Sequence, residues 1–247
     1  MYQIDLNSDL GESFGRYTIG NDDKIIPLIT SANVACGYHA SDPVVMMETI
    51  QRAKEAGIAV GAHPGLPDLM GFGRRSMAIS NEETKAYTLY QISAIGGMCK
   101  AAGVKLQHVK PHGALYNMAA KDYDLCEAIY EYDKDLIVMG LSGSEMIKAA
   151  KDCGLKSASE VFADRAYEED GTLVNRRKPG AMIEDEDEAI NRVIRMINEG
   201  KVTSITGKDI DIKADSVCVH GDGEKALLFV EKIRKTFVEN EIEICHL

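Results

Sequence analysis

Hydrophobic and polar positions along this chain follow two alternating periods, in which a short strand-like run is followed by a longer stretch with helical spacing. This alternation continues over the whole length, which predicts parallel strands joined by right-handed crossovers. The expected fold is therefore α/β, either a doubly wound sheet or a closed barrel, and the pattern alone does not decide between the two. The seven strand-like runs are residues 2–7, 32–36, 58–62, 105–112, 136–141, 158–164 and 216–220.

Several of the predicted helices have recognisable end signals. Asp42 followed by Pro43 fits an N-cap and a first helical residue, and Gly57 is placed to end the same helix. Capping boxes are expected where a serine precedes a glutamate by three residues, with a glycine ending each helix. These pairs are Ser80 with Glu83, whose helix ends at Gly103, and Ser142 with Glu145, whose helix ends at Gly154.

No linker-like or low-complexity segment interrupts the alternation, so we expect one domain that spans residues 1–247. The least regular part is residues 167–215. Within it we expect an acidic helix near residues 184–199 and a β-hairpin within residues 202–212.

Composition and charge exclude several classes of protein. The chain has 247 residues, of which 45% are hydrophobic and 27% are charged, as in an average globular domain. The formal net charge of -11 repels phosphate backbones, which argues against nucleic-acid binding. An anionic substrate would need a local basic pocket instead.

Cysteine usage and the first residues indicate the compartment. The six cysteines form no C-x-x-C pair, so neither a zinc ribbon nor a disulfide framework is expected. The first residues lack the basic and apolar parts of a secretory signal, and the apolar runs are too short to span a bilayer. We therefore expect a soluble cytoplasmic protein with no membrane partner.

Polar residues suited to catalysis follow the predicted strands. In α/β sheets and barrels, ligands bind at the carboxyl ends of the strands, where the loops converge. Four of the six histidines stand at such ends beside a glycine. The residues placed there are Asp5, Asn7, Asp9, Glu12, Asn33, Cys36, His39, His63, Lys110, His112, His220 and Asp222.

The period of two within a strand groups further side chains. On the fourth predicted strand it places His108, Lys110 and His112 on one face, and on the sixth it groups Glu160 with Asp164. If the sheet is a barrel and this face is the inner one, Lys110 and His112 rise into the mouth and His108 lies deeper.

Structural interpretations compete with functional ones for some of these residues. Asp42 fits a helix cap, His108 a hydrogen-bonded core histidine, and Cys36 a small buried side chain. The basic residues 74–75 and 176–178 are ordinarily solvated loop charges. In a chain this acidic they could also grip an anionic substrate.

The functional interpretation is favoured for Asp9, Glu12, His63, His112 and His220. Carboxylates and imidazoles at one mouth suit two kinds of chemistry. One is a divalent metal that activates water, with ligands drawn from Asp9, His39, His63 and His112. The other is general acid–base catalysis without a metal. The spacing does not separate them, because the chain contains no HExxH or close HxH motif.

Nucleotide-binding motifs are weak in this chain. No P-loop occurs, because Val202 stands where the first glycine before Gly207-Lys208 would be required. Residues 221–226 match the GxGxxA form of the dinucleotide fingerprint, but no full βαβ unit follows them. A helix starting there could still cradle a phosphate.

The chain closely resembles a known family in five long segments. They are DLNSDLGESFG at 5–15, SANVACGYHASDP at 31–43, GAHPGLPDLMGFGRR at 61–75, HVKPHGALYN at 108–117 and VCVHGDG at 217–223. These segments resemble the LamB/YcsF family. Departures from its usual residues are small, namely Ser41, Leu66 and Gly223, and none removes a candidate catalytic group.

The resemblance implies a distorted seven-stranded (β/α) barrel like that of polysaccharide deacetylases. It also implies opening of 5-oxoproline to L-glutamate at the expense of ATP, with Mg²⁺ and two partner subunits. The coupling makes chemical sense, because a five-membered lactam is a poor electrophile and phosphorylation of its carbonyl oxygen supplies a leaving group before water attacks.

We hypothesise a role for each candidate residue in such a reaction. Asp9 and Glu12 act as base or metal ligands, and His63 and His112 act in acid–base catalysis or metal binding. The substrate carboxylate or phosphate is gripped by a lysine and an arginine, and further polar residues line the site. These are Lys110 and Arg176 for the grip, His220 and Asp222 beside the phosphoryl group, and Asn7, Asn33 and Asp164 for substrate binding.

Two other functions remain open at this point. A metal-dependent deacetylase or amidohydrolase acting alone would share the barrel and the acid–imidazole mouth. A non-catalytic component would bind a small carboxylate for its partners and would tolerate the loss of His112.

Overall fold

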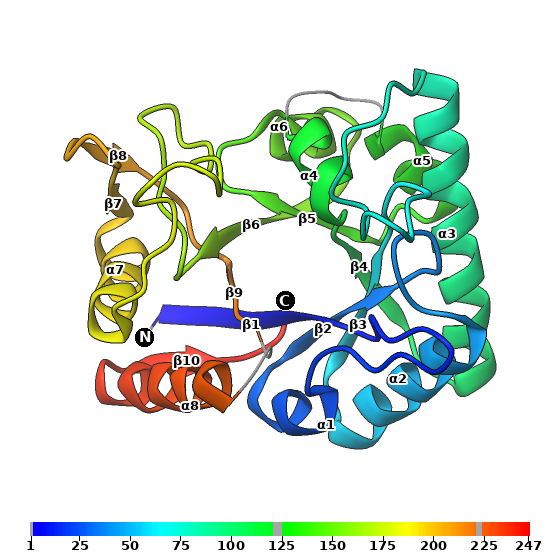
Figure 1. Ribbon diagram of the computed structural model, residues 1–247, viewed down its shortest axis with the longest axis horizontal. Coiled ribbons are helices and arrows are strands. Elements are labelled where there is room, and N and C mark those ends of the chain that lie inside the picture. Colours follow the sequence, from blue (N-terminus) through cyan, green and yellow to red (C-terminus); the bar gives the residue numbers. More distant parts are fainter. Residues whose placement is uncertain (1, 121–124, 221–223) are drawn as a thin grey trace.

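The computed structural model describes residues 2–120, 125–220 and 224–247. Seven strands of an eight-stranded sheet follow one another in the order β1-β2-β3-β4-β5-β6-β9, and β9 pairs again with β1, so the sheet closes into a barrel (Figure 1). All of these pairings are parallel. The barrel-forming strands are β1 (Tyr2–Leu10), β2 (Ser31–Ala35), β3 (Ala59–His63), β4 (Leu106–Val109), β5 (Ile137–Leu141), β6 (Lys156–Phe162) and β9 (Ser216–Cys218). The closed-barrel alternative is thus confirmed, and all seven predicted strands are present.

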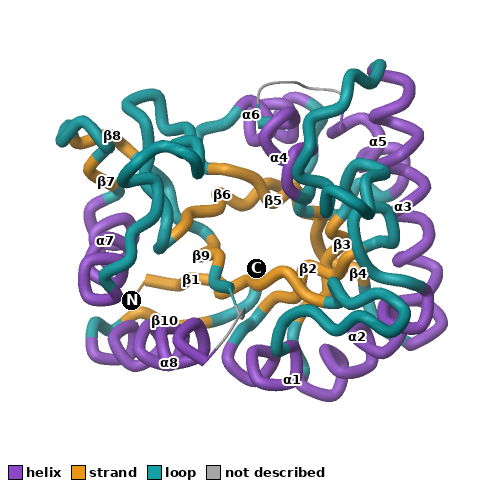
Figure 2. Tube along the Cα trace, viewed as in Figure 1, coloured by secondary structure: helices purple, strands orange, loops and turns teal. Residues whose placement is uncertain are grey.

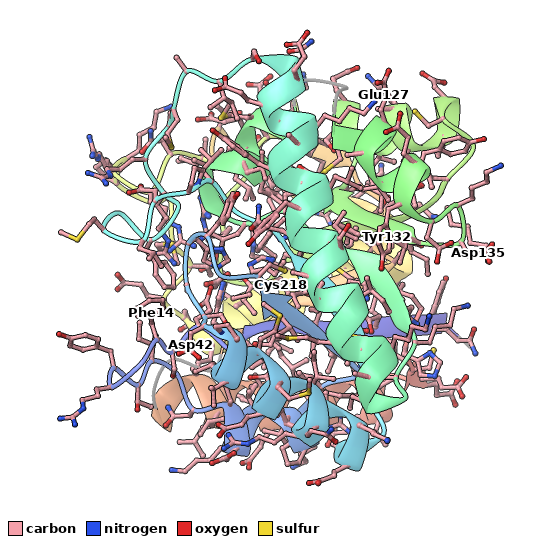
Figure 3. All side chains as sticks on the ribbon, turned by 90° about the vertical axis from the view of Figure 1, so that its right-hand side faces the viewer. Phe14, Asp42, Glu127, Tyr132, Asp135 and Cys218 are labelled. Carbon is pink, nitrogen blue, oxygen red and sulfur yellow. The ribbon has the colours of Figure 1, made fainter. Side chains whose placement is uncertain are left out.

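Helices surround the ring of strands (Figure 2). Seen from the side, the long helix α3 (Asn81–Ala102) runs across the outside of the barrel (Figure 3). Cys218 is buried, whereas Glu127 is exposed. The apolar core lies between the strands and these helices and includes fully buried Val60, Ile92 and Ile95. The helices are α1 (Asp22–Ile25), a 3₁₀ turn (Ile26–Leu28), α2 (Pro43–Ala56), α3 (Asn81–Ala102), α4 (Gly113–Ala119), α5 (Leu125–Tyr132), α6 (Glu145–Asp152), α7 (Glu186–Glu199) and α8 (Glu224–Glu239).

Most of the predicted helix ends are confirmed. The Asp42 carboxylate accepts hydrogen bonds from the N–H groups of Val44 and Val45, and the capping box at the start of α3 is complete. Gly57 and Gly103 end their helices in the left-handed conformation, each with φ of 70°. A glycine is favoured there because it has no Cβ to clash.

The predicted capping box at Ser142 is wrong. Helix α6 begins later than that box requires, with Ser144 as its N-cap and no side-chain capping hydrogen bond. Ser142 Oγ instead accepts a hydrogen bond of 2.9 Å from the N–H of Lys213. The serine follows β5 directly, so it fastens the loop before β9 to the barrel rather than capping a helix.

Two small elements complete the fold. The expected hairpin is present as β7 (Lys201–Thr203) and β8 (Asp209–Asp211), which pair antiparallel. Strand β10 (Ile242–Ile244) pairs in parallel with the first residues of β1 and was not expected, because a three-residue run gives too little pattern. The Leu247 carbonyl then accepts a hydrogen bond from Gln107 Nε2 of β4.

The interior of the barrel is unusually polar. A (β/α) barrel is ordinarily filled by branched aliphatic side chains. Here the strands direct buried polar side chains inward, and Gly61 leaves room for one of them, since a Cβ at this position would collide with the His108 ring. These side chains are Asp5, Asn7, Ser31, Asn33, His108, Lys110, Glu160 and Ser216. Within the described residues, no helix is both long enough and apolar enough to span a bilayer.

Candidate active site

The deepest polar contacts converge on one carboxylate. Asp5 accepts hydrogen bonds from the hydroxyls of Thr30 at 2.7 Å, of Ser31 at 2.6 Å and of Ser216. Asn7 Nδ2 in turn donates to Ser216 Oγ at 2.7 Å. Burial raises the pKa of Asp5, although the hydroxyl donors oppose that effect.

The hydrogen-bond network continues from Asp5 toward Asp9 through the side-chain amides of Asn7 and Asn33. Asn33 Nδ2 donates to Asn7 Oδ1 at 2.8 Å and to Asp9 Oδ1 at 2.9 Å. His108 Nε2 lies 2.8 Å from Asn33 Oδ1, and burial lowers the pKa of His108 to about 3. The interpretation of His108 as a buried, hydrogen-bonded histidine is confirmed. We call Asp5, Asn7, Thr30, Ser31, Asn33, His108 and Ser216 the floor network.

Lys110 is enclosed above the floor network. Its Nζ lies 2.9 Å from Asp9 Oδ1, 2.8 Å from Glu160 Oε1 and 3.1 Å from Asn7 Oδ1. Burial alone would lower the pKa of Lys110, but the neighbouring charges, Asp9 foremost, hold it well above the ordinary value. Lys110 could therefore grip a substrate anion only by giving up a contact it already has.

Glu160 and Tyr116 form a hydrogen-bonded pair beside Lys110. Neither residue was assigned a role from the sequence. Tyr116 donates a hydrogen bond of 2.7 Å from its hydroxyl to Glu160 Oε2. The strand period had placed Glu160 on the inner face, but it could not show that β4 and β6 bring Lys110 and Glu160 together across the barrel.

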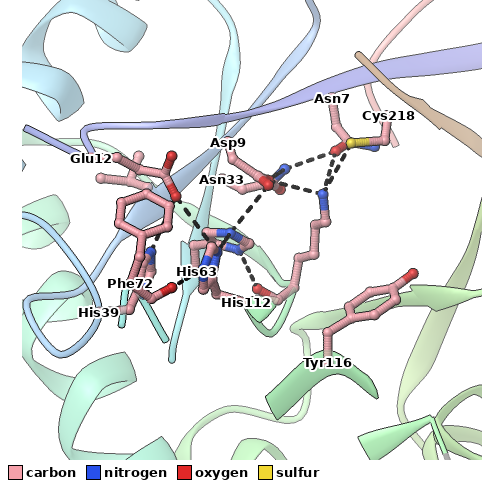
Figure 4. Close-up of polar contacts among 12 residues, drawn as sticks. Asn7, Asp9, Glu12, Asn33, His39, His63, Phe72, His112, Tyr116 and Cys218 are labelled. Carbon is pink, nitrogen blue, oxygen red and sulfur yellow. Dashed lines mark hydrogen bonds and ion pairs between the residues drawn. The ribbon is translucent and has the colours of Figure 1, made fainter. Parts of the chain in front are cut away.

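Three imidazoles and a carboxylate gather at the mouth. Glu12 Oε1 lies 3.2 Å from His39 Nε2 and 3.5 Å from His112 Nδ1, and His112 Nδ1 lies 3.0 Å from His63 Nε2 (Figure 4). The rings of His39 and His112 stack with centroids 3.7 Å apart. We call Glu12, His39, His63 and His112 the mouth cluster.

Backbone carbonyls fix the tautomers of two of these rings. His63 Nδ1 lies 2.6 Å from the Lys110 carbonyl oxygen, and His112 Nε2 lies 2.9 Å from the Phe72 carbonyl oxygen. A carbonyl oxygen only accepts, so these two ring nitrogens carry the hydrogens. In neutral rings the opposite nitrogens, His63 Nε2 and His112 Nδ1, then face each other with lone pairs only.

Two rings of the mouth cluster, His39 and His112, are uncharged near neutral pH. Burial lowers the pKa of His112 to about 3 and lowers that of His39 well below its ordinary value, so both rings are neutral near pH 7. The ligand atoms of the mouth cluster all lie within 4.8 Å of one another. Nitrogen and oxygen ligand atoms converge here, and carbonyls hold the far ring nitrogens of His63 and His112, which is typical of a metal-binding site.

The structure groups the expected metal ligands differently from the sequence-based set. His39, His63 and His112 come together, but the carboxylate that completes their group is Glu12. Asp9 Oδ2 lies 3.4 Å from His63 Nε2, and Asp9 also belongs to a second group with Cys218 and His220.

A second pair lies beside Asp9, and its histidine, His220, belongs to the group that also contains Cys218. His220 Nδ1 lies 3.4 Å from Asp164 Oδ2. Burial would lower the pKa of His220, but Cys218 and Asp164 hold it well above the ordinary value. Arg176 is exposed on the loop after β6, and Asp222 lies outside the described residues.

Cys36 lies buried near this mouth. Its side chain is 3% exposed, and burial raises the pKa of the thiol to about 12. The interpretation of Cys36 as a small buried side chain is confirmed.

These features define a (β/α)-barrel enzyme whose acidic and imidazole side chains meet at the carboxyl ends of the strands. The chain belongs to the LamB/YcsF family, whose model matches residues 4–247. A Clostridium beijerinckii relative, named as the A subunit of 5-oxoprolinase, is 63% identical, covering 100% of this chain and 98% of that protein.

Solved structures agree with this assignment. The lactam utilization protein from Thermus thermophilus superposes with a TM-score of 0.92 at 42% identity, covering 99% of this chain and 100% of that one. A family 4 carbohydrate esterase from Streptomyces lividans shares the fold alone, with a TM-score of 0.51 at 12% identity, covering 98% and 91% of the two chains. The expected deacetylase-like barrel is confirmed.

Proposed function

We propose that this chain is the A subunit of a 5-oxoprolinase, which opens 5-oxoproline to L-glutamate and hydrolyses ATP together with two other subunits. The observation that carries the proposal is the full-length identity of 63% to a relative of that name. The mouth cluster supports it, because it places several proton acceptors beside one another at the mouth of the barrel.

Ring opening requires two proton movements. A water oxygen bonds to the lactam carbonyl carbon, the carbon–nitrogen bond breaks, one proton leaves the water and one reaches the ring nitrogen. Glu12, Asp9, His63 and His112 present lone pairs that can accept the first proton. His220, whose pKa is raised by the neighbouring Cys218 and Asp164, can donate the second.

ATP supplies the driving force in this proposal. The γ-phosphoryl group of ATP passes to the lactam carbonyl oxygen and ADP leaves, with Mg²⁺ accompanying the nucleotide. Water then adds to the carbonyl carbon and the carbon–nitrogen bond breaks, which leaves a γ-glutamyl phosphate. A second water releases phosphate and L-glutamate. The chain has no P-loop, so we assign nucleotide hydrolysis to the complex with its partner subunits rather than to this chain alone.

The mouth cluster also fits a divalent metal. Glu12, His39, His63 and His112 would hold it, and their lone pairs already converge. When bound, such a metal would act as a Lewis acid and would lower the pKa of a water molecule. Stacking of His39 on His112, and the hold of the Phe72 carbonyl on His112, keep these rings oriented whether or not the metal is present.

Reconstitution with the two partner subunits tests the function. The complete enzyme should release ADP only in the presence of 5-oxoproline, and the isolated chain should hydrolyse ATP negligibly. Brisk ATP hydrolysis by the isolated chain, or hydrolysis of simple acetamides without ATP, would instead support the stand-alone amidohydrolase.

A further inference from the structure

Asp164 and Arg165 follow β6 at the mouth of the barrel, where Asp164 lies beside His220. Phe162 of β6 pairs in register with Cys218 of β9. Two residues beyond each of them, Asp164 Oδ2 lies 3.4 Å from His220 Nδ1. The carboxyl ends of barrel strands are where ligands bind. Arg165 was noted from the sequence only as the start of a loop.

Arg165 is a buried cation without a carboxylate partner. Arg165 is only 7% exposed. Its Nη2 donates a hydrogen bond of 2.7 Å to the Val174 carbonyl oxygen, and its Nε has no hydrogen-bond partner among the described residues. No acidic group in the described part of the chain lies within ion-pair distance of it. A buried, unpaired charge is costly, so such a group is retained most readily where a ligand completes it.

Asp164 offers the matching acceptor. Its Oδ2 contacts His220, whereas its Oδ1 is buried and has no hydrogen-bond partner among the described residues. Two adjacent residues at the mouth therefore present one unpaired donor and one unpaired acceptor.

The surrounding charges favour an anion at Arg165. Burial lowers the pKa of Arg165, and the charge of the nearby Arg176 lowers it further. The Asp164 carboxylate opposes both effects. Because the Arg165 side chain has no ion-pair partner within the described ranges of the chain, it binds an anion more strongly than a neutral group. Lys110, the other candidate grip, already lies within 3.1 Å of three protein oxygens.

We infer that Asp164 and Arg165 form a two-point recognition site for a ligand that carries a carboxylate next to an N–H group, with Arg165 binding the carboxylate and Asp164 Oδ1 accepting from the N–H. The assignment of this ligand to 5-oxoproline rests on the proposed function. In that molecule the carboxylate-bearing carbon is bonded directly to the ring nitrogen, so both groups are presented on one side of the ring.

Binding of three related ligands to the purified chain tests the two points separately. They are 5-oxoproline, 2-pyrrolidone, which lacks the carboxylate, and 5-oxotetrahydrofuran-2-carboxylate, in which a ring oxygen replaces the N–H. A charge-assisted hydrogen bond changes affinity by about 10- to 100-fold. We expect wild-type protein to prefer 5-oxoproline over each analogue by a factor in that range, measured by calorimetry.

Variants then assign each preference to a residue. Arg165→Gln should weaken 5-oxoproline binding by about 10- to 100-fold and leave 2-pyrrolidone binding unchanged. Asp164→Ala should remove the preference for the lactam over the lactone. Arg165→Lys should restore part of the carboxylate preference, and Arg177→Gln, which removes an exposed charge from the same loop, is the matched control and should change neither.

Several outcomes would overturn the inference. One is equal affinity of wild type and Arg165→Gln for 5-oxoproline, with both proteins folded by circular dichroism. Another is loss of inorganic phosphate binding in Arg165→Gln with 5-oxoproline binding intact, which would make the site a phosphoryl site. A third is the absence of any ligand binding to the wild type. If the reconstituted enzyme is inactive while the Arg165-dependent preferences hold, the proposed function fails and the recognition site stands.

Discussion

The floor network and the mouth cluster use the same kinds of side chain in opposite ways. In the floor network, hydroxyls and amides donate in sequence toward the carboxylates of Asp5 and Asp9. In the mouth cluster, ring nitrogens of His63 and His112 and a carboxylate oxygen of Glu12 converge on one another. The first arrangement is complete by itself and stabilises the barrel, whereas the second needs a proton, a metal or a substrate to complete it. We therefore expect the chemistry to take place at the mouth cluster.

The largest expected effect is on catalysis at the mouth. His112→Ala should lower 5-oxoproline-dependent ADP release by the reconstituted enzyme by about 10²- to 10⁴-fold, because an acid–base group is lost. Its melting temperature should remain close to that of the wild type, since the mouth cluster does not complete the fold. His246→Ala removes an exposed histidine from the tail and serves as the control. Full activity in His112→Ala would refute the catalytic assignment. Asp9→Ala should lower activity by a similar factor and should also lower the melting temperature, because it removes an ion-pair partner of the buried Lys110.

A metal-binding experiment tests whether the mouth cluster, unlike the floor network, needs a bound ion to be complete. Adding Zn²⁺ at 100 times its dissociation constant should stabilise the native chain by about 2.7 kcal/mol, seen as a rise in melting temperature. His39→Asn should abolish that rise, because it removes one of four converging ligands. If the rise persists in His39→Asn, or if the wild-type protein shows none, the mouth cluster is a proton-transfer site without a metal.

A substitution in the barrel wall should affect stability rather than binding. Gly61→Ala places a methyl group against the His108 ring, and overpacking of this kind costs about 1–3 kcal/mol. Urea denaturation measures the loss, and the affinity of the surviving folded protein for 5-oxoproline should be unchanged. Gly97→Ala is the control, because a Cβ at that helical position meets nothing within 4 Å. Equal stability of the two variants would show that the interior is more loosely packed than described.

The smallest expected effect is a pH dependence from the floor network. The pKa of Asp5 is raised in the folded chain, so the folded state holds this proton more tightly than the unfolded state. The resulting stability is present below the ordinary carboxyl pKa and is lost as pH rises through the folded pKa, with a slope of at most about 1.4 kcal/mol per pH unit. Comparing urea denaturation of wild type and Asp5→Asn across acidic pH isolates this contribution. An identical pH profile in both proteins would contradict it.

The local sequence pattern was sufficient to predict the strands and many of the residues at the mouth of the barrel. The period of two placed His108, Lys110 and His112 on one face, and the glycine-flanked histidines marked the strand ends. Whether the sheet closed could not be read locally, because closure depends on β9 returning to β1 from the far end of the chain. The family resemblance, rather than periodicity, indicated the barrel.

Partnerships across the barrel were beyond the reach of the sequence pattern. Glu12 reaches the three histidines only because the loops after β1 and β2 turn at Gly11 and Gly37, whose φ angles are 68° and 92°. The lone-pair conflict between His63 and His112 depends on two backbone carbonyls from different loops. The missing partners of Asp164 and Arg165 likewise become visible only once every neighbouring side chain is placed.

The polar filling of the barrel has a consequence for engineering this scaffold. Aliphatic interiors accept many combinations of residues of similar volume. In this barrel, each inward side chain must instead match the hydrogen-bond donor or acceptor of its neighbour. A random library over the inward strand positions would yield mostly unpaired groups, and acceptable changes there must come in matched sets. New substrate preferences are better sought among the surface loops, whose replacement leaves those pairings alone.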